Sequence, residues 1–268
     1  MSLPKGDFMP RKAKPYRLIE GDCLERMREV QASSIDLIIA DLPYGITKCH
    51  WDQRIDLDRF WAEVRRVLKA DGCAVMFADM KLAVELINAN RSWFRYDLVW
   101  EKTKAVGFLN ANRQPLRAHE LVLIFSKSPS IYRPQMKEGS PYRIASKKQS
   151  NIYGSFKGIA ISNVRLRFPK SVFRFSNNFE RGNGGRFLKG PGHPTSKPIE
   201  LLTWLIQTFS DSGMSVLDPS MGSGSTGIAC LRTGRKFVGI ELDAGFFEIA
   251  STRLANEHKG TYAKTQAQ

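Results

Sequence analysis

Residues 218–224 read DPSMGSG, and this stretch decides the fold. The residues just before it, 215–217, predict a short strand, and residues 226–233 have the pattern of a helix. Glu241 follows about 20 residues after the first glycine, at the end of the next expected strand, 236–240. A glycine-rich turn between a strand and a helix, with an acid closing the next strand, is typical of a nucleotide-binding α/β unit.

The other strands of the sheet are expected upstream, because few residues follow this unit. Residues 35–40 (IDLIIA) and 73–78 (CAVMFA) are continuous apolar runs, typical of strands buried on both faces of a parallel sheet. Helical spacing of apolar residues appears at 56–69 and at 81–90. The alternation predicts a doubly wound, mostly parallel α/β fold. Its chain order is permuted, with the nucleotide-binding half last.

The remaining expected elements complete this pattern. Residues 94–100 and 121–125 read as two strands, which we expect to pair antiparallel at an edge. The others are a strand at 17–20 leading into a helix through Val30, and helices at 198–209 and 244–257. We divide the chain into five parts. They are a flexible basic tail (1–15), a first half that we expect to carry the catalytic residues (16–127), an insertion (128–190), a second half that we expect to bind the nucleotide-like cofactor (191–258) and a flexible C-terminal tail (259–268).

Residues 41–45 (DLPYG) follow the apolar run 35–40 directly. Parallel sheets carry functional residues at the carboxyl ends of their strands, so we expect Asp41 to meet the glycine turn at one edge. The Asp41 carboxylate and the Leu42 carbonyl can both accept hydrogen bonds from an amino group and orient its lone pair. Tyr44 offers a ring for stacking an extruded base. A plain polar turn is the alternative, since Asp, Pro and Gly all form turns.

Positive charge is concentrated in the insertion. The whole chain carries a formal charge of +15, and residues 128–190 hold 13 Lys/Arg against 2 Asp/Glu, with nine Tyr or Phe among them. This composition indicates a nucleic-acid partner, because Lys and Arg bind phosphates. A solvated basic loop is the alternative. The side chains expected on DNA are Arg133, Arg143, Lys147, Lys148, Lys157, Arg165, Arg167, Lys170, Arg174, Arg181 and Arg186.

Taken together, DLPYG and DPSMGSG resemble the catalytic and donor-binding motifs of the amino-methyltransferases of DNA. The likeness covers roughly residues 16–257, and the order of catalytic motif, basic insertion and donor loop is that of the β class. Further segments similar to that family are GDCLE at 21–25, RAHELVLIFSK at 117–127, FPKSVFRFSN at 168–177 and HPTSKP at 193–198.

The resemblance implies a seven-stranded sheet and methyl transfer from S-adenosylmethionine to the exocyclic amino group of a base flipped out of double-stranded DNA. It places the target-recognition region in the insertion. Aspartate at position 41 favours adenine N6 over cytosine N4. Leu42 departs from the family's proline, and Met221 from its alanine. The resemblance assigns catalysis to Asp41, Leu42, Pro43 and Tyr44, and donor binding to Asp22, Lys197, Asp218, Pro219, Ser220, Gly222, Gly224 and Glu241.

Four other functions stay open at this point. The chain could methylate cytosine N4 instead of adenine N6, or act on RNA or a protein amide. It could be a non-catalytic DNA-binding relative, which the departures at Leu42 and Met221 motivate. It could also be an NAD enzyme that uses the glycine turn.

Composition limits the setting. None of the four cysteines (Cys23, Cys49, Cys73 and Cys230) lies in a CxxC pair, so we expect a reducing cytoplasm, in a bacterium or encoded by a phage. Metal-ligand spacing of His, Asp and Glu is absent, so we expect no metal. The chain has no run of about 18 apolar residues, and we expect no membrane span. A homodimer is suggested by the family resemblance alone.

Overall fold

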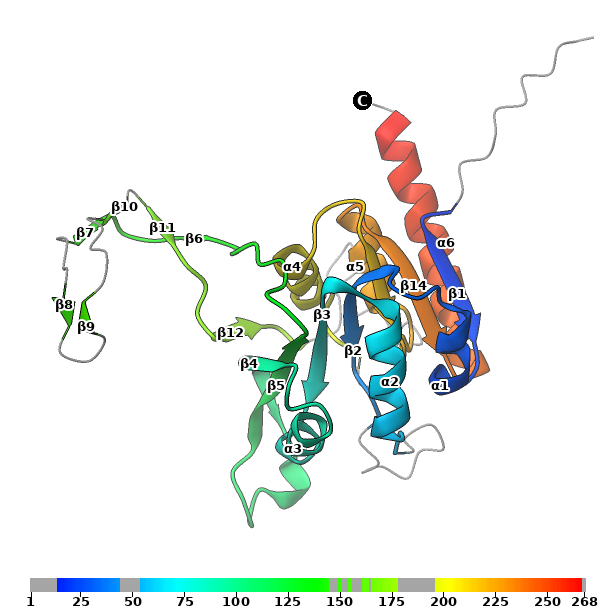
Figure 1. Cartoon of the computed structure of the whole chain (residues 1–268), viewed down its shortest axis with the longest axis horizontal. Coiled ribbons are helices and arrows are strands. Elements are labelled where there is room, and N and C mark those ends of the chain that lie inside the picture. Colours follow the sequence, from blue (N-terminus) through cyan, green and yellow to red (C-terminus); the bar gives the residue numbers. More distant parts are fainter. Residues whose placement is uncertain are drawn as a thin grey trace, which may run out of the picture.

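The fold is built around one eight-stranded sheet (Figure 1). The computed structural model describes residues 14–43, 54–144, 149–150, 154–155, 161–163, 165–177 and 196–266. Along the sheet the strand order is β1-β14-β13-β2-β3-β5-β4-β12. The bounds are β1 (Tyr16–Glu20), β2 (Ile35–Ala40), β3 (Leu68–Ala78), β4 (Phe94–Val106), β5 (Arg117–Ser126), β12 (Val172–Phe175), β13 (Ser215–Asp218) and β14 (Lys236–Glu241).

The first five strands along the sheet, β1, β14, β13, β2 and β3, run parallel to one another. At the other edge, β12 runs parallel to β4. β5 is antiparallel to both of its neighbours, β3 and β4. Since β3 and β4 both oppose β5, they point the same way, and β4 ends at the same edge as the parallel strands. The doubly wound, mostly parallel fold expected from the sequence is therefore confirmed.

Helices cover both faces of the sheet. α1 (Cys23–Arg26), η1 (Met27–Glu29), α2 (Leu57–Val67) and α3 (Met80–Ala89) pack into one apolar core. α4 (Ile199–Phe209), α5 (Ser225–Arg232) and α6 (Ala244–Gln266) pack into the other. β2 serves both cores, because Leu37 and Ile39 face one side while Ile38 and Ala40 face the other.

The topological switch point lies between β13 and β2. The chain leaves β13 through α5 on one face and leaves β2 through α2 on the opposite face. Asp36 ties this junction together, since its carboxylate accepts from Ser215 N at 2.8 Å and pairs with Lys69 Nζ at 2.7 Å. In folds of this kind the crevice outside such a switch point binds ligands.

Several element boundaries differ from the sequence prediction. β12 belongs to the main sheet, which corrects the interpretation of 128–190 as lying outside it and raises the strand count from seven to eight. Phe173 is buried and packs on Trp204, with ring centroids 4.9 Å apart, and this contact draws β12 onto the sheet. α2 ends at Val67, and the Asp71-Gly72 step lies inside β3 instead of ending a helix. α6 continues to Gln266, past the expected end at Glu257.

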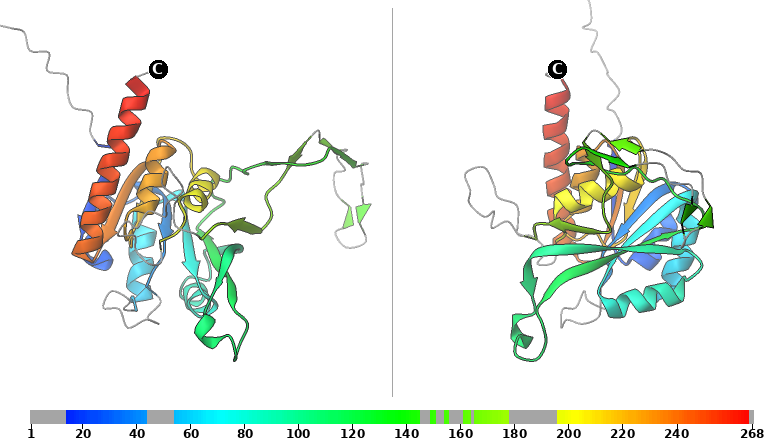
Figure 2. Two further views of the ribbon diagram at one scale, coloured as in Figure 1. Left: turned by 180° about the vertical axis from the view of Figure 1, so that it is seen from behind. Right: turned by 90° about the vertical axis from the view of Figure 1, so that its left-hand side faces the viewer.

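The rest of the insertion forms an arm of short antiparallel pairs (Figures 1 and 2). Its strands are β6 (Lys137–Glu138), β7 (Tyr142–Ile144), β8 (Gln149–Ser150), β9 (Gly154–Ser155), β10 (Ile161–Asn163) and β11 (Leu166–Arg167). The arm leaves the sheet after Ser126, which pairs with Cys73, and Cys73 in turn pairs with Leu37 near the start of β2. It therefore departs from the edge opposite to the carboxyl ends of the parallel strands.

Three of the cysteines, Cys23, Cys73 and Cys230, are buried free thiols, and Cys49 lies outside the described residues. Among the described residues, no helix is both long and apolar enough to span a bilayer. In the same part of the chain, no three His, Cys, Asp or Glu side chains are grouped so that they could hold a metal ion.

Candidate active site

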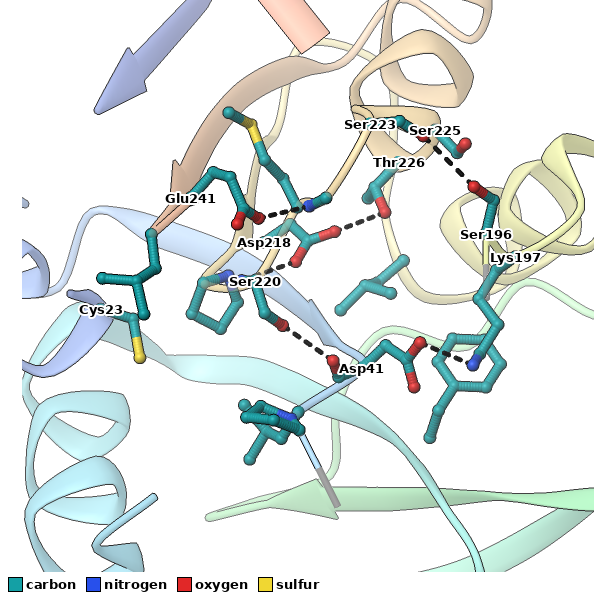
Figure 3. Close-up of a pocket in the computed structure, with 18 of the residues that line it drawn as sticks. Cys23, Asp41, Ser196, Lys197, Asp218, Ser220, Ser223, Ser225, Thr226 and Glu241 are labelled. Atoms are coloured by element: carbon teal, nitrogen blue, oxygen red, sulfur yellow. Dashed lines mark hydrogen bonds and ion pairs between the residues drawn. The ribbon is translucent and has the colours of Figure 1, made fainter. Parts of the chain in front are cut away.

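A pocket of about 680 Å³ opens at the carboxyl ends of β13 and β2 (Figure 3). That volume lies within the range of small-molecule and cofactor sites. Its lining comes from both halves of the chain, including Asp22 and Asp41 from the first half and Asp218 and Glu241 from the second. The two motifs that we expected to meet at one sheet edge therefore line the same pocket. A direct bond joins them, because Ser220 Oγ donates to the Asp41 carbonyl at 3.1 Å.

On one side of the pocket, backbone groups hold the acidic residue that ends β14. Glu241 accepts from Gly222 N at 2.8 Å through one oxygen and from Asp243 N at 2.9 Å through the other. Gly224 has a φ of +82°, which favours glycine, and a Cβ there would press on Leu254 and Ala250. The turn is thus fixed in shape before any ligand binds, and the Glu241 oxygens keep lone pairs for two further donors.

Asp218 lies beneath the same turn and is almost fully buried. It accepts from Thr226 Oγ1 at 2.6 Å and from Ser220 N at 3.0 Å. Burial raises its pKa to about 7, although these two hydrogen bonds act in the opposite direction. Burial likewise raises the pKa of Glu241, against the hydrogen bonds from Asp243 and Gly222.

The departures from the family motif are accommodated by neighbouring residues. Met221 is buried, and its sulfur lies where a Cβ on Gly239 would be, so the glycine makes room for the larger side chain. Leu42 is 2% exposed and belongs to the core on the α2 face. Both residues fill space in the folded core, and neither distorts the pocket that they border.

On the other side of the pocket, an alternating chain of charges begins at Asp41. Lys197 Nζ donates to Asp41 Oδ2 at 2.6 Å and lies 2.9 Å from Glu120 Oε1. Lys102 Nζ lies 2.8 Å from Glu120 Oε2. The Lys197 and Glu120 side chains are only 10% and 8% exposed. Lys197 also lies over the Phe77 ring, 4.9 Å from its centroid, which further restricts the ammonium.

Each buried charge in this network of Asp41, Lys197, Glu120 and Lys102 is matched by a neighbour of opposite charge. Burial alone would raise the pKa of Glu120, but Lys197 and Lys102 outweigh it and lower the pKa to about 2. Burial would lower the pKa of Lys197, but Asp41 and Glu120 outweigh it and raise the pKa. The network is therefore ionised, and Asp41 is held in place through its pair with Lys197.

The pocket is acidic although the chain is strongly basic. Its described lining includes six carboxylates but only three cationic side chains, while the chain as a whole carries +15. The carboxylates are Asp22, Asp41, Asp56, Glu120, Asp218 and Glu241, and the cations are Arg54, Lys102 and Lys197. Such a lining favours a cationic ligand with hydroxyl and amino donors.

The comparisons with known proteins agree with this geometry. A family model described as DNA methylase, covering N6 and N4 amino-methyltransferases, matches residues 35–252. The chain belongs to this DNA methylase family.

Two curated relatives of this methylase are each 26% identical to it. One is the type II methyltransferase M.HpaI of Haemophilus parainfluenzae, aligned over 91% of this chain and 76% of the relative. The other is the DNA adenine methyltransferase YhdJ of Escherichia coli (strain K12), aligned over 88% of this chain and 82% of the relative.

Solved structures share the fold at lower identity. The cytosine-N4-specific PvuII DNA methyltransferase matches with a TM-score of 0.63 and 17% identity, covering 92% of each chain. The complex of M1.HpyAVI with S-adenosylmethionine (SAM) matches with a TM-score of 0.58 and 19% identity, over 89% of this chain and 99% of that one. These likenesses show the shared fold, and membership of the DNA methylase family makes the chain a DNA amino-methyltransferase that uses S-adenosylmethionine.

The residues of this methylase fit that cofactor. S-adenosylmethionine carries a positive sulfonium, two ribose hydroxyls and an adenine amino group, and the pocket offers carboxylates to all three kinds of group. Asp22 lines the pocket while its Oδ1 caps α1 by accepting from Leu24 N at 2.8 Å. Lys197, which the resemblance assigned to donor binding, has the Asp41 carboxylate as a direct partner in this structure.

The assigned site residues are only partly gathered at the pocket. Those that line it are Asp22, Asp41, Leu42, Pro43, Lys197, Asp218, Pro219, Ser220, Gly222 and Glu241. Gly224 is the N-cap of α5, at the end of the same turn. Tyr44 lies outside the described residues.

None of the assigned DNA-binding residues that the structure describes lines the pocket, and several of these have protein partners. Arg133 makes a two-pronged pair with Asp211, at 3.0 and 2.9 Å, and Arg174 lies 3.7 Å from Glu101. Arg167 donates to the carbonyls of Leu166 and Ser140. Those described as exposed are Arg133, Arg143, Arg165, Lys170 and Arg174, and those outside the described residues are Lys147, Lys148, Lys157, Arg181 and Arg186.

Glu120 and Lys102 were missed from the sequence. Glu120 directly precedes the apolar residues 121–125 (LVLIF) within β5. A carboxylate next to such an apolar run is a usable signal for a buried ion pair. Lys102 lies within β4, beyond the expected strand end at residue 100, so nothing in the local pattern placed it near Glu120.

Proposed function

We propose that this methylase transfers a methyl group from S-adenosylmethionine to the N6 amino group of adenine in double-stranded DNA, at a specific sequence. The supporting observation is the position of the Asp41 carboxylate, held by Lys197 in a pocket that also contains the glycine turn. A basic chain supplies the attraction for DNA, and an acidic pocket supplies a place for the cationic donor.

Asp41 is the residue that would act on the target base. Its carboxylate accepts a hydrogen bond from the exocyclic amino group, which turns the nitrogen lone pair out of the ring's conjugation. When bound, S-adenosylmethionine supplies an electrophilic methyl group on a positively charged sulfur. Lys197 keeps the Asp41 carboxylate in one orientation, so the amino group arrives already aligned.

The donor side would position the cofactor through hydrogen bonds. Glu241 accepts from the ribose hydroxyls with the lone pairs that Gly222 and Asp243 leave available. Asp22 accepts from the adenine amino group at the far end of the pocket. The buried acids on this side also place negative charge near the sulfonium.

Adenine N6 is favoured over cytosine N4 by two observations. Position 41 is an aspartate, which the resemblance associates with adenine N6, and one of the relatives is named a DNA adenine methyltransferase. Cytosine N4 is the alternative, favoured by the structural likeness to the cytosine-N4-specific PvuII enzyme. The M.HpaI relative, a type II methyltransferase, supports a place in restriction-modification.

The proposal is tested by analysing DNA from cells that express the chain. Digestion to nucleosides and mass spectrometry should reveal N6-methyladenine, and methylation-aware sequencing should give the recognition site. N4-methylcytosine in its place would contradict the assignment of the base. Methylated RNA or protein with unmodified DNA would contradict the whole proposal.

Asp41→Ala is the matching test of the residue. We expect transfer to duplex DNA to fall by at least about 1,000-fold, while S-adenosylmethionine binding by calorimetry stays within about twofold. Asp58→Ala is the control, because Asp58 is exposed on α2 and lies outside the pocket lining. Undiminished transfer by Asp41→Ala would remove Asp41 from the mechanism.

A further inference from the structure

A second feature of the pocket edge, the hairpin between β4 and β5, has no role in the function proposed above. Val106 at the end of β4 lines the pocket together with Asp41. Beyond it the chain turns through Gly107, with a φ of +88°, into the short helix η2 (Phe108–Asn110). Figures 1 and 2 show this hairpin projecting past the sheet. Phe108 lies two residues from the pocket wall, a span of about 7 Å at most.

The tip of the hairpin exposes large apolar side chains. Phe108 is 77% exposed and Leu109 is 85% exposed, the two highest values among the large hydrophobic residues described as exposed. Holding two such side chains in water offers a folded chain no stability by itself. Adjacent exposed apolar residues of this size mark a surface that binds something.

The residues around the tip favour DNA as the partner. Residues 101–118 hold four cationic side chains against one acid, Glu101. Lys102 and Arg117 pair with Glu120 and Asp79, so the exposed Lys104 and Arg113 are the cations that can meet phosphates. A second copy of this chain would bring the same positive charges against each other. A duplex instead offers phosphates to the basic flanks and stacked bases to the apolar tip.

The base of the hairpin is braced on both strands by contacts with neighbouring segments. Asn177 accepts from Lys104 N at 2.9 Å and donates to the Lys104 carbonyl at 2.9 Å. On the other strand, Arg117 lies 3.6 Å from Asp79, the N-cap of α3. A wedge needs such support, because it must push bases apart without folding back.

We propose that Phe108 and Leu109 form a wedge that enters the DNA stack beside the target base and fills the space left when that base moves into the pocket. The inference rests on the proposed function, since it assumes a flipped base. Extruding a base costs a few kcal/mol of stacking and pairing, and less when the base is already mismatched. Apolar side chains inserted between base steps are a known way to offset such a cost.

The test uses the full-length protein and short duplexes that contain the site found by sequencing. For Phe108→Ala/Leu109→Ala we expect at least a tenfold loss of transfer to a fully paired duplex. We expect most of that loss to be recovered when the target base faces a mismatch, because a mismatch removes the work that the wedge does. Val84→Ala is the matched control, since Val84 is an apolar residue 50% exposed on α3. It should transfer at the wild-type rate on both duplexes.

The outcomes separate the wedge from the enzyme. A wild-type protein that methylates no DNA contradicts the proposed function, and the wedge with it. An active wild type with an equally active double variant on paired DNA overturns the wedge alone. Equal loss on paired and mismatched duplexes also overturns it, because the tip would then act in some step other than extrusion. A change from dimer to monomer in the double variant, seen by light scattering, would reassign the tip to self-association.

Discussion

The two sides of one pocket treat their carboxylates in opposite ways. On the donor side, Asp218 and Glu241 are held by backbone N–H groups and a hydroxyl, and burial raises the pKa of both. On the target side, Glu120 is held by two ammonium groups, which lower its pKa to about 2. Carboxylates of similar burial thus have a raised pKa on the donor side and a lowered pKa on the target side.

Under the proposed function, the difference follows from what each side would receive. The donor side would receive a cation, and among the described residues no ammonium or guanidinium group is paired with Asp218 or Glu241, which preserves their attraction for the sulfonium. The target side awaits a neutral amino group, which could not replace a missing cation. Its acids therefore need protein partners of their own, and Lys197 supplies one to Asp41 and Glu120 together.

The largest effect is expected from Lys197→Met, which removes the cation shared by Asp41 and Glu120. Removing one partner of a buried pair costs about 3–5 kcal/mol, so the free energy of unfolding should fall by that order. Transfer should fall as well, because Asp41 loses its orientation. Urea unfolding and a transfer assay measure the two effects.

The double variant Lys197→Met/Glu120→Gln is the control for this change. Its stability should partly return, because it no longer buries the Glu120 charge alone. Its transfer should stay low, because Asp41 still lacks the Lys197 ammonium that orients it. If Lys197→Met is as stable as the wild type, the target side is not held by these charges and the contrast between the two sides fails.

A smaller effect, confined to the donor side, is expected from Glu241→Gln. An amide oxygen can still accept from the ribose, but the charge is lost, and hydrogen bonds to charged groups are worth about 1.5–3 kcal/mol. S-adenosylmethionine affinity should fall about 10- to 100-fold in calorimetry, with DNA binding unchanged. Glu20→Gln is the matched control, because Glu20 is exposed and pairs with Glu241 in register on β1. If S-adenosylmethionine affinity falls equally in both variants, the loss comes from the reduced negative charge of the protein and not from the position of Glu241.

The smallest effect is expected in the pH dependence of stability without ligand. Asp218 has a raised pKa of about 7 against an ordinary value of 3.8, so the folded state binds the extra proton and stability falls as pH rises from about 4 to 7. Asp218→Asn should remove that fall. Glu120 has a lowered pKa, so its contribution is present above about pH 4.5 and is lost as pH falls towards 2.

Urea unfolding at a series of pH values separates these two contributions. The loss of stability as the pH falls from about 4.5 towards 2 should disappear in Glu120→Gln and persist in Asp218→Asn. A fall in stability between about pH 4 and 7 that is as steep in Asp218→Asn as in the wild type would show that Asp218 is not its source.

The sequence predicted what depends on local pattern. Apolar runs such as 35–40 identified the central strands, and the pattern around the glycine turn predicted the unit of β13, α5 and β14. The meeting of Asp41 with that turn was also predictable, because parallel strands share a carboxyl edge. None of these inferences needed the position of a distant side chain.

The contacts that escaped prediction are long-range. Lys197 reaches Asp41 across 156 positions of sequence, and no local spacing indicates such a pair. β12 was missed because Val172–Phe175 is short and lies in a basic segment, and its burial depends on Trp204 far along the chain. Packing between remote segments decides such features.

The permuted strand order has a consequence for how the chain assembles. β1 is synthesised long before β14, its partner in the sheet. β2 likewise needs β13 on one flank. A nascent chain therefore exposes unpaired strand edges until β13 and β14 have been made, and such edges favour misassembly. The parallel part of the sheet can close only after both of these late strands have left the ribosome.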